Sequence, residues 1–396
     1  MGERNLDFDR IIDRRNTDCL KYDFAERRGK PEDVLPLWVA DMDFPTSGYV
    51  LDALQERVAH GIFGYTEIGD RYFEAVAGWM ERKHGWQVKQ DWLVKTPGVV
   101  FGLAMAVKAF TEKGDSVLIQ QPVYYPFKEV IEDNDRQVVS SDLVLGSDNR
   151  YHIDFADFER KIIENQVRLF ILCSPHNPVG RVWKRDELLK IGELCLKHGV
   201  LVVSDEIHQD FVYGENKHLV FADLAPEFEK ISITCTSPAK TFNLAGLQVS
   251  NLFIPDPALR EAFRKQIAAS GYSQLNTLGL TAGEAAYRFG EEWHNGVIDY
   301  LEQNIIYLKS YLNQELPEIR MIEPEGTYLV WLDFRGLGLT VPELEHLIIH
   351  KAKLWLDSGA IFGAAGEGFQ RINIACPRAT LKQALEQLKQ AVKEIG

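Results

Sequence analysis

Five short runs of almost uninterrupted apolar residues constrain the fold of this 396-residue chain more than any other feature. They are residues 116–120 (SVLIQ), 167–173 (VRLFILC), 200–206 (VLVVSDE), 231–236 (ISITCT) and 249–255 (VSNLFIP). Such β-rich runs are typical of strands that are buried on both faces of a sheet. Between them, residues 98–110 predict a buried helix, and residues 186–198 have the apolar spacing of a crossover helix. We therefore expect an α/β fold with a parallel or mixed sheet.

The pattern changes near residue 290 and predicts a second, smaller α+β domain. Helices are expected over residues 293–316, 341–352 and 380–395, and alternating strands over residues 325–334 and 369–377. The first residues, rich in proline and aromatic side chains, read as an arm. We predict an N-terminal arm (1–47) that joins the small domain, a large domain (48–288) and a C-terminal small domain (289–396).

Composition excludes several functions. The net charge of −14 argues against nucleic-acid binding, which needs a basic surface. The polar start MGERNLDFDR is not a secretory signal, and no apolar run approaches the roughly 18 residues that span a bilayer. Five scattered cysteines fit a reducing compartment, and the ten histidines form no HExxH metal motif. We expect a cytoplasmic protein without nucleic-acid, membrane or metal partners.

The stretch SPAKTFNLAG (237–246) places Lys240 just past the end of the 231–236 strand. An amine in a partly dry pocket there can form a Schiff base with an aldehyde cofactor such as pyridoxal phosphate; the alternative is a lysine on an exposed loop. Asp205 ends the 200–206 strand, and ligands of parallel sheets bind beyond the carboxyl ends of strands. Asp205 can keep a pyridine nitrogen protonated, or it can cap a helix.

Further residues extend this site. Asn177 can donate to a ring oxygen, although Asn-Pro is also a common turn former. The backbone N–H groups of Val99 and Val100, at the start of the 98–110 helix, form a natural phosphate cradle, to which Ser237 can add a hydroxyl. A glycine at a helix start is, however, often only a cap.

Aromatic and basic residues complete the predicted constellation. Tyr124 and Tyr125 follow the 116–120 strand, where an aromatic ring can stack on the cofactor and its neighbour can face the substrate; ordinary packing is the alternative. Arg371 lies on a mostly apolar strand and needs an anion. A substrate α-carboxylate supplies one through a bidentate fork, and an intramolecular salt bridge is the alternative.

Taken together, these residues resemble the fold-type I pyridoxal-phosphate enzymes of the class I/II aminotransferase family. The resemblance rests on DEIH (205–208), SPAKTFNLAGLQ (237–248) and RINIACPR (371–378) and covers nearly the whole chain. It implies a mainly parallel, seven-stranded mixed sheet, with Lys240 bound to pyridoxal phosphate. It also implies a homodimer in which Tyr65 reaches the phosphate of the neighbouring subunit.

Two positions depart from the aminotransferase pattern. His208 stands where tyrosine is usual, and Gln248 stands where an arginine usually grips the phosphate. Both departures are similar to the MalY/PatB-type C–S lyases, which implies β-elimination from cystathionine or a related S-substituted L-cysteine. Lys240 would then act as base, with Lys240, Tyr124 or Tyr65 as candidate proton donors and His208 in the cofactor pocket.

Two other functions stay open at this point. An aminotransferase needs the same Lys240, Asp205 and Arg371, so these residues do not distinguish it from a lyase. A regulator that binds a partner protein is the alternative from another class, since members of this lyase group are known to double as regulators.

Overall fold

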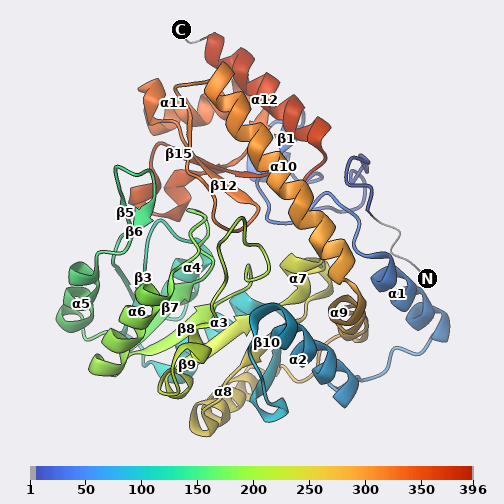
Figure 1. Ribbon diagram of the computed structural model, residues 1–396, viewed down its shortest axis with the longest axis vertical. Coiled ribbons are helices and arrows are strands. Elements are labelled where there is room, and N and C mark those ends of the chain that lie inside the picture. Colours follow the sequence, from blue (N-terminus) through green and yellow to red (C-terminus); the bar gives the residue numbers. More distant parts are fainter. Residues whose placement is uncertain (1–5, 395–396) are drawn as a thin grey trace.

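The computed structural model describes residues 6–394 and contains two main sheets (Figure 1). The larger sheet has seven strands in the order β2-β10-β9-β8-β7-β3-β4, with β10 antiparallel to both neighbours and the other pairs parallel. Its strands are β2 (Leu93–Thr96), β3 (Ser116–Ile119), β4 (Gln137–Ser140), β7 (Leu169–Cys173), β8 (Leu201–Asp205), β9 (Ser232–Thr236) and β10 (Ser250–Phe253). The predicted mainly parallel mixed sheet is confirmed.

Helices cover both faces of this sheet, which explains why its strands are apolar at successive positions. Leu118 and Phe170 pack on one face with α5 (Phe155–Glu164) and α6 (Arg185–His198). Val117 and Leu169, their chain neighbours, pack on the other face with α3 (Val99–Phe110), α4 (Pro126–Glu132) and α8 (Pro257–Ala269). Side chains alternate between faces along a strand, so a sheet covered twice needs apolar residues throughout.

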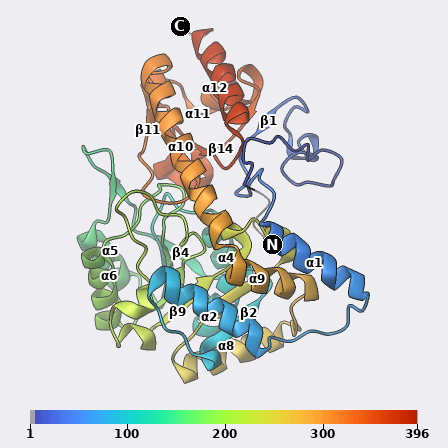
Figure 2. The same ribbon diagram turned by 45° about the vertical axis from the view of Figure 1, so that its right-hand side comes forward.

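Three helices that the sequence patterns did not predict pack beside the sheet. They are α1 (Gly48–His60), α2 (Asp70–His84) and α9 (Thr277–Phe289), and their buried side chains share one core with α10 (Glu291–Glu315). The long helix α10 runs from this region up to the second sheet (Figures 1 and 2). It therefore links the two parts of the molecule.

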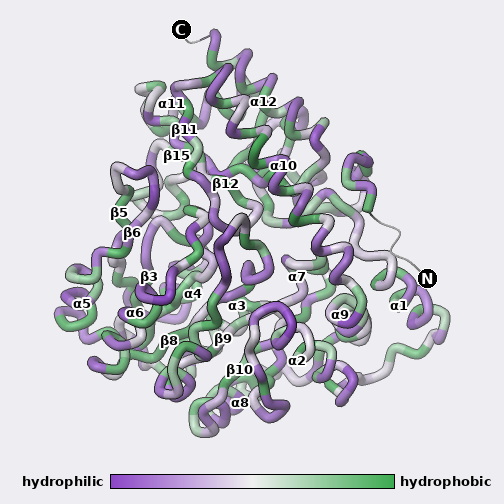
Figure 3. Tube along the Cα trace, viewed as in Figure 1, coloured by the Kyte–Doolittle hydropathy of each residue, from purple (hydrophilic) through white to green (hydrophobic). Residues whose placement is uncertain are grey.

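The second sheet is antiparallel, in the order β11-β12-β15-β14. Its strands are β11 (Arg320–Met321), β12 (Leu329–Asp333), β14 (Asp357–Ser358) and β15 (Phe369–Asn373). The α10 and α12 (Arg378–Lys393) helices alternate hydrophilic and hydrophobic residues, and they cover one face of the sheet (Figure 3). Every residue of β12 and β15 is nevertheless buried, because the other face packs against Phe362 and the arm.

The predicted helix 341–352 is divided into α11 (Val341–His346) and a π-helical turn, Leu347–Lys351. The predicted arm pairs with the small sheet region through β1 (Leu35–Pro36), parallel to β13 (Leu354–Trp355). Residues 1–5 and 395–396 of the predicted arm and small domain lie outside the described residues, and the domain limits stay a prediction. No helix within residues 6–394 is both long and apolar enough to cross a membrane.

The shorter elements lie in the connections. They are the strands β5 (Val144–Leu145) and β6 (Tyr151–His152), the helix α7 (Pro238–Thr241), and the 3-10 turns Glu26–Arg28, Gln90–Trp92, Phe221–Leu224, Phe228–Lys230, Ala245–Leu247, Arg335–Leu337, Gly359–Phe362 and Ala364–Gly366.

Candidate active site

A cavity of about 230 Å³ lies at the carboxyl ends of the parallel strands of the large sheet. Most of the predicted site residues line it: Val99, Val100, Tyr124, Asn177, Asp205, His208, Ser237 and Lys240. Ala40 of the arm and Gln248 line it as well. The expectation that strand ends far apart in sequence meet in one crevice therefore agrees with the geometry.

Lys240 lies in the four-residue helix α7, directly after β9. Ser237 caps this helix, because its hydroxyl accepts a hydrogen bond from the N–H of Ala239 at 3.0 Å. The Nζ of Lys240 donates to the carbonyl oxygen of Ala40 at 2.6 Å. Burial lowers the pKa of the amine to about 8, against the raising effect of the Asp41 carboxylate. About a tenth of the amine is therefore neutral, and nucleophilic, at pH 7, far more than for an ordinary lysine.

Asp205 is the last residue of β8 and lies between two buried neighbours, Cys173 on β7 and Cys235 on β9. Its Oδ1 accepts a hydrogen bond from the N–H of Ile207 at 3.1 Å. Burial raises the pKa of this carboxyl to about 7, although that hydrogen bond and the charge of Lys240 oppose the rise. A buried carboxylate of this kind is stabilised by a cationic N–H donor, such as a protonated pyridine nitrogen.

Arg371 and Asn177 form one buried unit. The Nη1 of Arg371 donates to Oδ1 of Asn177 at 2.9 Å, so the amide N–H groups of Asn177 remain to donate into the cavity. The Nη2 of Arg371 donates to the carbonyl oxygen of Trp38 at 2.9 Å and also pairs with the Asp357 carboxylate. The salt bridge that the sequence left as an alternative is thus present.

The salt bridge to Asp357 leaves some N–H donors of the Arg371 guanidinium unused. Arginine has five N–H donors, and three contacts are made to Asn177, Trp38 and Asp357. The Nε of Arg371 is buried and has no hydrogen-bond partner among the described residues. Arg371 therefore keeps donors for a further anion.

His208 and Tyr124 contribute neutral groups to the cavity. Burial, together with the charges of Lys240 and Arg371, lowers the pKa of His208 well below its usual value, so the imidazole is neutral. Its buried Nδ1 has no hydrogen-bond partner among residues 6–394. Burial raises the pKa of the Tyr124 hydroxyl, which therefore stays protonated.

The end of the cavity near α3 suits a phosphate in part. Val99 and Val100 form the first turn of α3, and no side chain caps that turn, so its N–H groups are available to an anion. The hydroxyl of Ser237 instead donates to the carbonyl oxygen of Val249 at 2.7 Å, so its contact with a phosphate stays a prediction. Gln248 faces the cavity from a left-handed turn with φ 52°.

Three predicted residues are not among those that line this cavity: Tyr125, Tyr65 and Arg371, the last of which reaches it through Asn177. Tyr125 is half-buried and packs its ring near that of Phe362, with centroids 6.1 Å apart, and the Phe362 ring in turn lies under the Arg371 guanidinium. Tyr65 is 96% exposed, on the connection between α1 and α2. It lines a separate surface depression with Phe63 and Tyr272.

Sequence reasoning missed the contacts that the arm makes with the site. The carbonyl oxygen of Ala40 accepts from the hydroxyl of Tyr328 at 3.0 Å as well as from Lys240. Trp38 supplies a second carbonyl, to Arg371, and Asp357 supplies the carboxylate. Backbone acceptors carry no residue-type signal, so only the apolar stretch LPLWVADMDFP hinted that this segment packs inside the molecule.

These residues fit pyridoxal phosphate. Lys240 offers an amine that suits an aldehyde, Asp205 an acceptor that suits a protonated ring nitrogen, Asn177 a donor that suits a ring oxygen, and the start of α3 donors that suit a phosphate. The α/β fold with this site at its strand ends defines a pyridoxal-phosphate-dependent enzyme of fold type I.

Comparison with known proteins supports the same class of enzyme. Residues 32–388 match the family model described as aminotransferase class I and II, and the chain belongs to that family. It is 46% identical over 387 residues to cystathionine beta-lyase PatB of Bacillus subtilis (strain 168), a match that covers 98% of this chain and 100% of that protein.

Two solved structures extend the comparison. Cystalysin from Treponema denticola, which contains pyridoxal 5'-phosphate, superposes with a TM-score of 0.95 at 38% identity, over 98% of this chain and 99% of that one. The pyridoxal-phosphate-bound C–S lyase from Staphylococcus hominis gives a TM-score of 0.91 at 35% identity, over 97% of each chain.

Proposed function

We propose that this protein is a pyridoxal-phosphate-dependent C–S β-lyase. It cleaves cystathionine or related S-substituted L-cysteines to a thiol, pyruvate and ammonia. The observation that carries the proposal is one cavity in which the Lys240 amine, with a pKa of about 8, lies among Asp205, Asn177 and Tyr124. The cystathionine beta-lyase and C–S lyase names of similar proteins supply the leaving-group chemistry.

Pyridoxal phosphate, when bound, supplies an aldehyde that condenses with amines and a ring that accepts the electron pair released at the substrate Cα. Asp205 would hold the ring nitrogen and Asn177 the ring oxygen. The first turn of α3, with Gln248 beside it, would hold the phosphate. Gln248 carries no charge, so N–H groups and hydroxyls bear more of the phosphate binding than they would beside an arginine.

Arg371 orients the substrate. Its unused N–H donors bind the α-carboxylate, and the hydrogen bond to Asn177 keeps the guanidinium in place. The carboxylate contact fixes the direction of the Cα–H bond relative to Lys240. Tyr125 and Phe362 pack beside this contact and exclude water from it.

Lys240 moves the proton. Its amine, whose lowered pKa leaves it partly neutral, takes the Cα proton and becomes an ammonium. In the structure the carbonyl oxygen of Ala40 accepts a hydrogen bond from this amine. The thiolate that leaves Cβ then takes a proton from the Lys240 ammonium or from the Tyr124 hydroxyl, which its raised pKa keeps protonated.

The runner-up is an aminotransferase, which the family description favours. It differs in where the Cα proton goes and in needing a keto-acid acceptor. His208 and Gln248, which depart from the aminotransferase pattern, both line the cavity and support the lyase.

The site is proposed to be completed in a homodimer. Tyr65 is 96% exposed and lies outside the cavity of its own chain, and Ile62 and Phe63 beside it are 66% and 56% exposed. An apolar, exposed loop of this kind is suited to burial against a second copy, where Tyr65 would reach the partner's phosphate site. The cysteines are free, which supports the proposal of a reducing, cytoplasmic compartment.

The test is to incubate the cofactor-saturated protein with L-cystathionine and no keto acid, and to assay pyruvate and free thiol. Equimolar release of both supports the lyase. If neither appears and turnover begins only after a keto acid is added, the protein is an aminotransferase.

A further inference from the structure

The arm segment 38–43, which we name the arm strap, crosses the site between its two principal residues. The carbonyl oxygen of Trp38 accepts from Arg371 at 2.9 Å, and that of Ala40 accepts from Lys240 at 2.6 Å. The strap thus contacts both the residue that binds the substrate carboxylate and the residue that removes the Cα proton. The register of the strap, that is, which of its residues lies opposite Arg371 and which opposite Lys240, decides whether both contacts exist.

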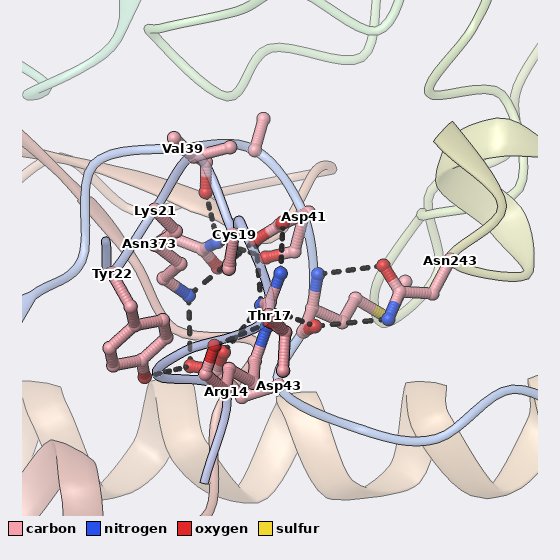
Figure 4. A network of polar contacts seen from close by, with 12 residues as sticks. Arg14, Thr17, Cys19, Lys21, Tyr22, Val39, Asp41, Asp43, Asn243 and Asn373 are labelled. Carbon is pink, nitrogen blue, oxygen red and sulfur yellow. Dashed lines mark hydrogen bonds and ion pairs between the residues drawn. The ribbon is translucent and has the colours of Figure 1, made fainter. Parts of the chain in front are cut away.

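Side chains from both parts of the molecule hold the strap through its backbone. Asn373 donates through Nδ2 to the carbonyl oxygens of Val39 and Asp41, each at 2.6 Å. On the other side, Asn243 accepts from the N–H of Met42 and donates to its carbonyl oxygen, both at 3.0 Å (Figure 4). These backbone hydrogen bonds alone would form nearly as well if the strap were shifted by two residues, because every residue offers the same N–H and C=O groups.

A charge cluster of Arg14, Lys21, Asp41 and Asp43 distinguishes the observed register of the strap from the shifted ones. Arg14 pairs with Asp41 at 2.6 Å and with Asp43 at 2.7 Å, and Lys21 pairs with Asp43 at 2.8 Å and lies 3.7 Å from Asp41 (Figure 4). Lys21 is fully buried, so its ammonium depends on these carboxylates. Two cations meet two anions, and the cluster is neutral.

The cluster specifies a position more than it adds stability. Buried ion pairs are costly to desolvate and contribute little net stability, but an unpaired buried charge is strongly unfavourable. An extended chain advances about 3.3 Å per residue, so a slip of even one residue would unpair Lys21. The same slip would carry the Ala40 carbonyl beyond hydrogen-bond reach of Lys240.

We propose that Asp41, held by Arg14 and Lys21, is a positioning residue that fixes the register of the arm strap, so that the carbonyl of Ala40 receives the Lys240 amine. The proposal rests on the proposed function only in assigning Lys240 as the residue that binds the cofactor and takes the proton. It adds to the site three residues from the arm that do not touch the cavity contents.

Asp41 also acts on the charge of Lys240. Three charged groups act on the amine: Asp41 from the strap, Arg371 from β15 and Asp205 from β8. The neutral His208 after β8 lines the same cavity, and Tyr328 before β12 donates to the same Ala40 carbonyl oxygen. Among the charges, Asp41 has the largest effect, and it raises the pKa of the Lys240 amine. Removal of the Asp41 charge should therefore lower that pKa, an effect that a purely structural role does not predict.

The test is the attachment of pyridoxal phosphate to the cofactor-free protein, followed by absorbance across a pH series. Measured at about pH 9, where the Lys240 amine is mostly neutral in both proteins, attachment to Asp41→Asn is expected to be about 10- to 100-fold slower, because a misplacement near 1 Å has effects of this size. Its pH midpoint should move below that of the unaltered protein. Asp13→Asn, the same charge change at an exposed arm residue, is the matched control and should change neither quantity.

A second variant guards against loss of folding. Lys21→Met with Asp41→Asn removes one cation and one anion, leaving the Arg14–Asp43 pair intact. It should fold and should show the slow attachment and the shifted midpoint. Attachment at the unaltered rate and midpoint in both variants would overturn the proposal. So would failure of both to fold, because the cluster would then hold the arm as a whole.

Cofactor attachment uses no sulfur substrate, so this result is independent of the lyase assay. If the unaltered protein releases no pyruvate from L-cystathionine but Asp41→Asn still slows attachment, the positioning role stands and the proposed function fails. In the loaded enzyme, Asp41→Asn should lower kcat more than it raises KM, because the base is displaced while Arg371 still binds the carboxylate.

Discussion

The buried pair of Arg371 and Asp357 allows stability and activity to be separated by substitution. The two side chains are 3% and 8% exposed, so solvent screens their interaction little. Arg371→Met leaves the Asp357 carboxylate buried without its cation. Breaking such a pair from one side costs about 3–5 kcal/mol of unfolding free energy. Adding Asp357→Asn replaces the unpaired charge by an unpaired amide, which costs about 1–3 kcal/mol, so the double variant should regain about 2 kcal/mol.

The stability effect of Arg371→Met should depend on pH. Burial raises the pKa of Asp357, and without Arg371 the attraction that opposes this rise is lost. A carboxyl with a higher pKa in the folded state binds more protons there, so stability falls as the pH rises above the unfolded pKa of about 4. The deficit of Arg371→Met should therefore widen from pH 5 upward, and the double variant should lack this widening.

Denaturant unfolding of the cofactor-free proteins measures these differences, and steady-state kinetics measures the activity. Both Arg371 variants should lose about 100-fold or more in kcat/KM, since the partner of a buried carboxylate contact is gone. Asp357→Asn alone serves as the control that keeps Arg371. Equal unfolding midpoints for Arg371→Met and the double variant would refute the pairing, and an unchanged KM in Arg371→Met would refute the carboxylate assignment.

Three further substitutions test the cofactor contacts. Lys240→Ala should abolish both the absorbance of attached pyridoxal phosphate and pyruvate release; continued turnover would reject Lys240 as base. Asp205→Asn should raise the unfolding free energy of the cofactor-free protein above pH 7 by up to about 4 kcal/mol, because a carboxyl with a folded pKa near 7 destabilises the fold once it is ionised. The same substitution should lower kcat by at least about 100-fold. A denaturant series and kinetics at pH 8 would show both effects, and an unchanged kcat would count against the role of Asp205. Gln248→Arg should tighten pyridoxal phosphate binding by about 10-fold in titrations of the cofactor-free protein, and unaltered affinity would show that residue 248 does not face the phosphate.

The sequence allowed the large sheet and its strand-end residues to be predicted because both depend on local patterns. Apolar runs marked β3, β7, β8, β9 and β10, and the polar residues that follow such runs, Lys240 and Asp205, were placed correctly in one cavity. The short strands β2 and β4 were missed. β4 (QVVS) lies at the sheet edge with three of its four residues less than fully buried, so its apolar signal is weak.

The contacts between distant segments could not be predicted from residue types. The pairing of Arg371 with Asp357 depends on the register of β14 against β15, which sets these two residues side by side. The approach of Ala40 to Lys240 joins residues 200 positions apart through a backbone carbonyl. Ser237 lines the cavity as expected, but the sequence did not indicate that its hydroxyl caps α7 and donates to the Val249 carbonyl oxygen, and its contact with a phosphate stays a prediction.

A lyase of the proposed kind eliminates a thiolate and keeps its cofactor in the aldehyde form. The most direct measurement counts the pyruvate formed per site from L-cystathionine without a keto acid and then identifies the cofactor that is released on denaturation. We expect many turnovers per site, with pyridoxal phosphate recovered. At most one turnover, with pyridoxamine phosphate recovered, would contradict this expectation.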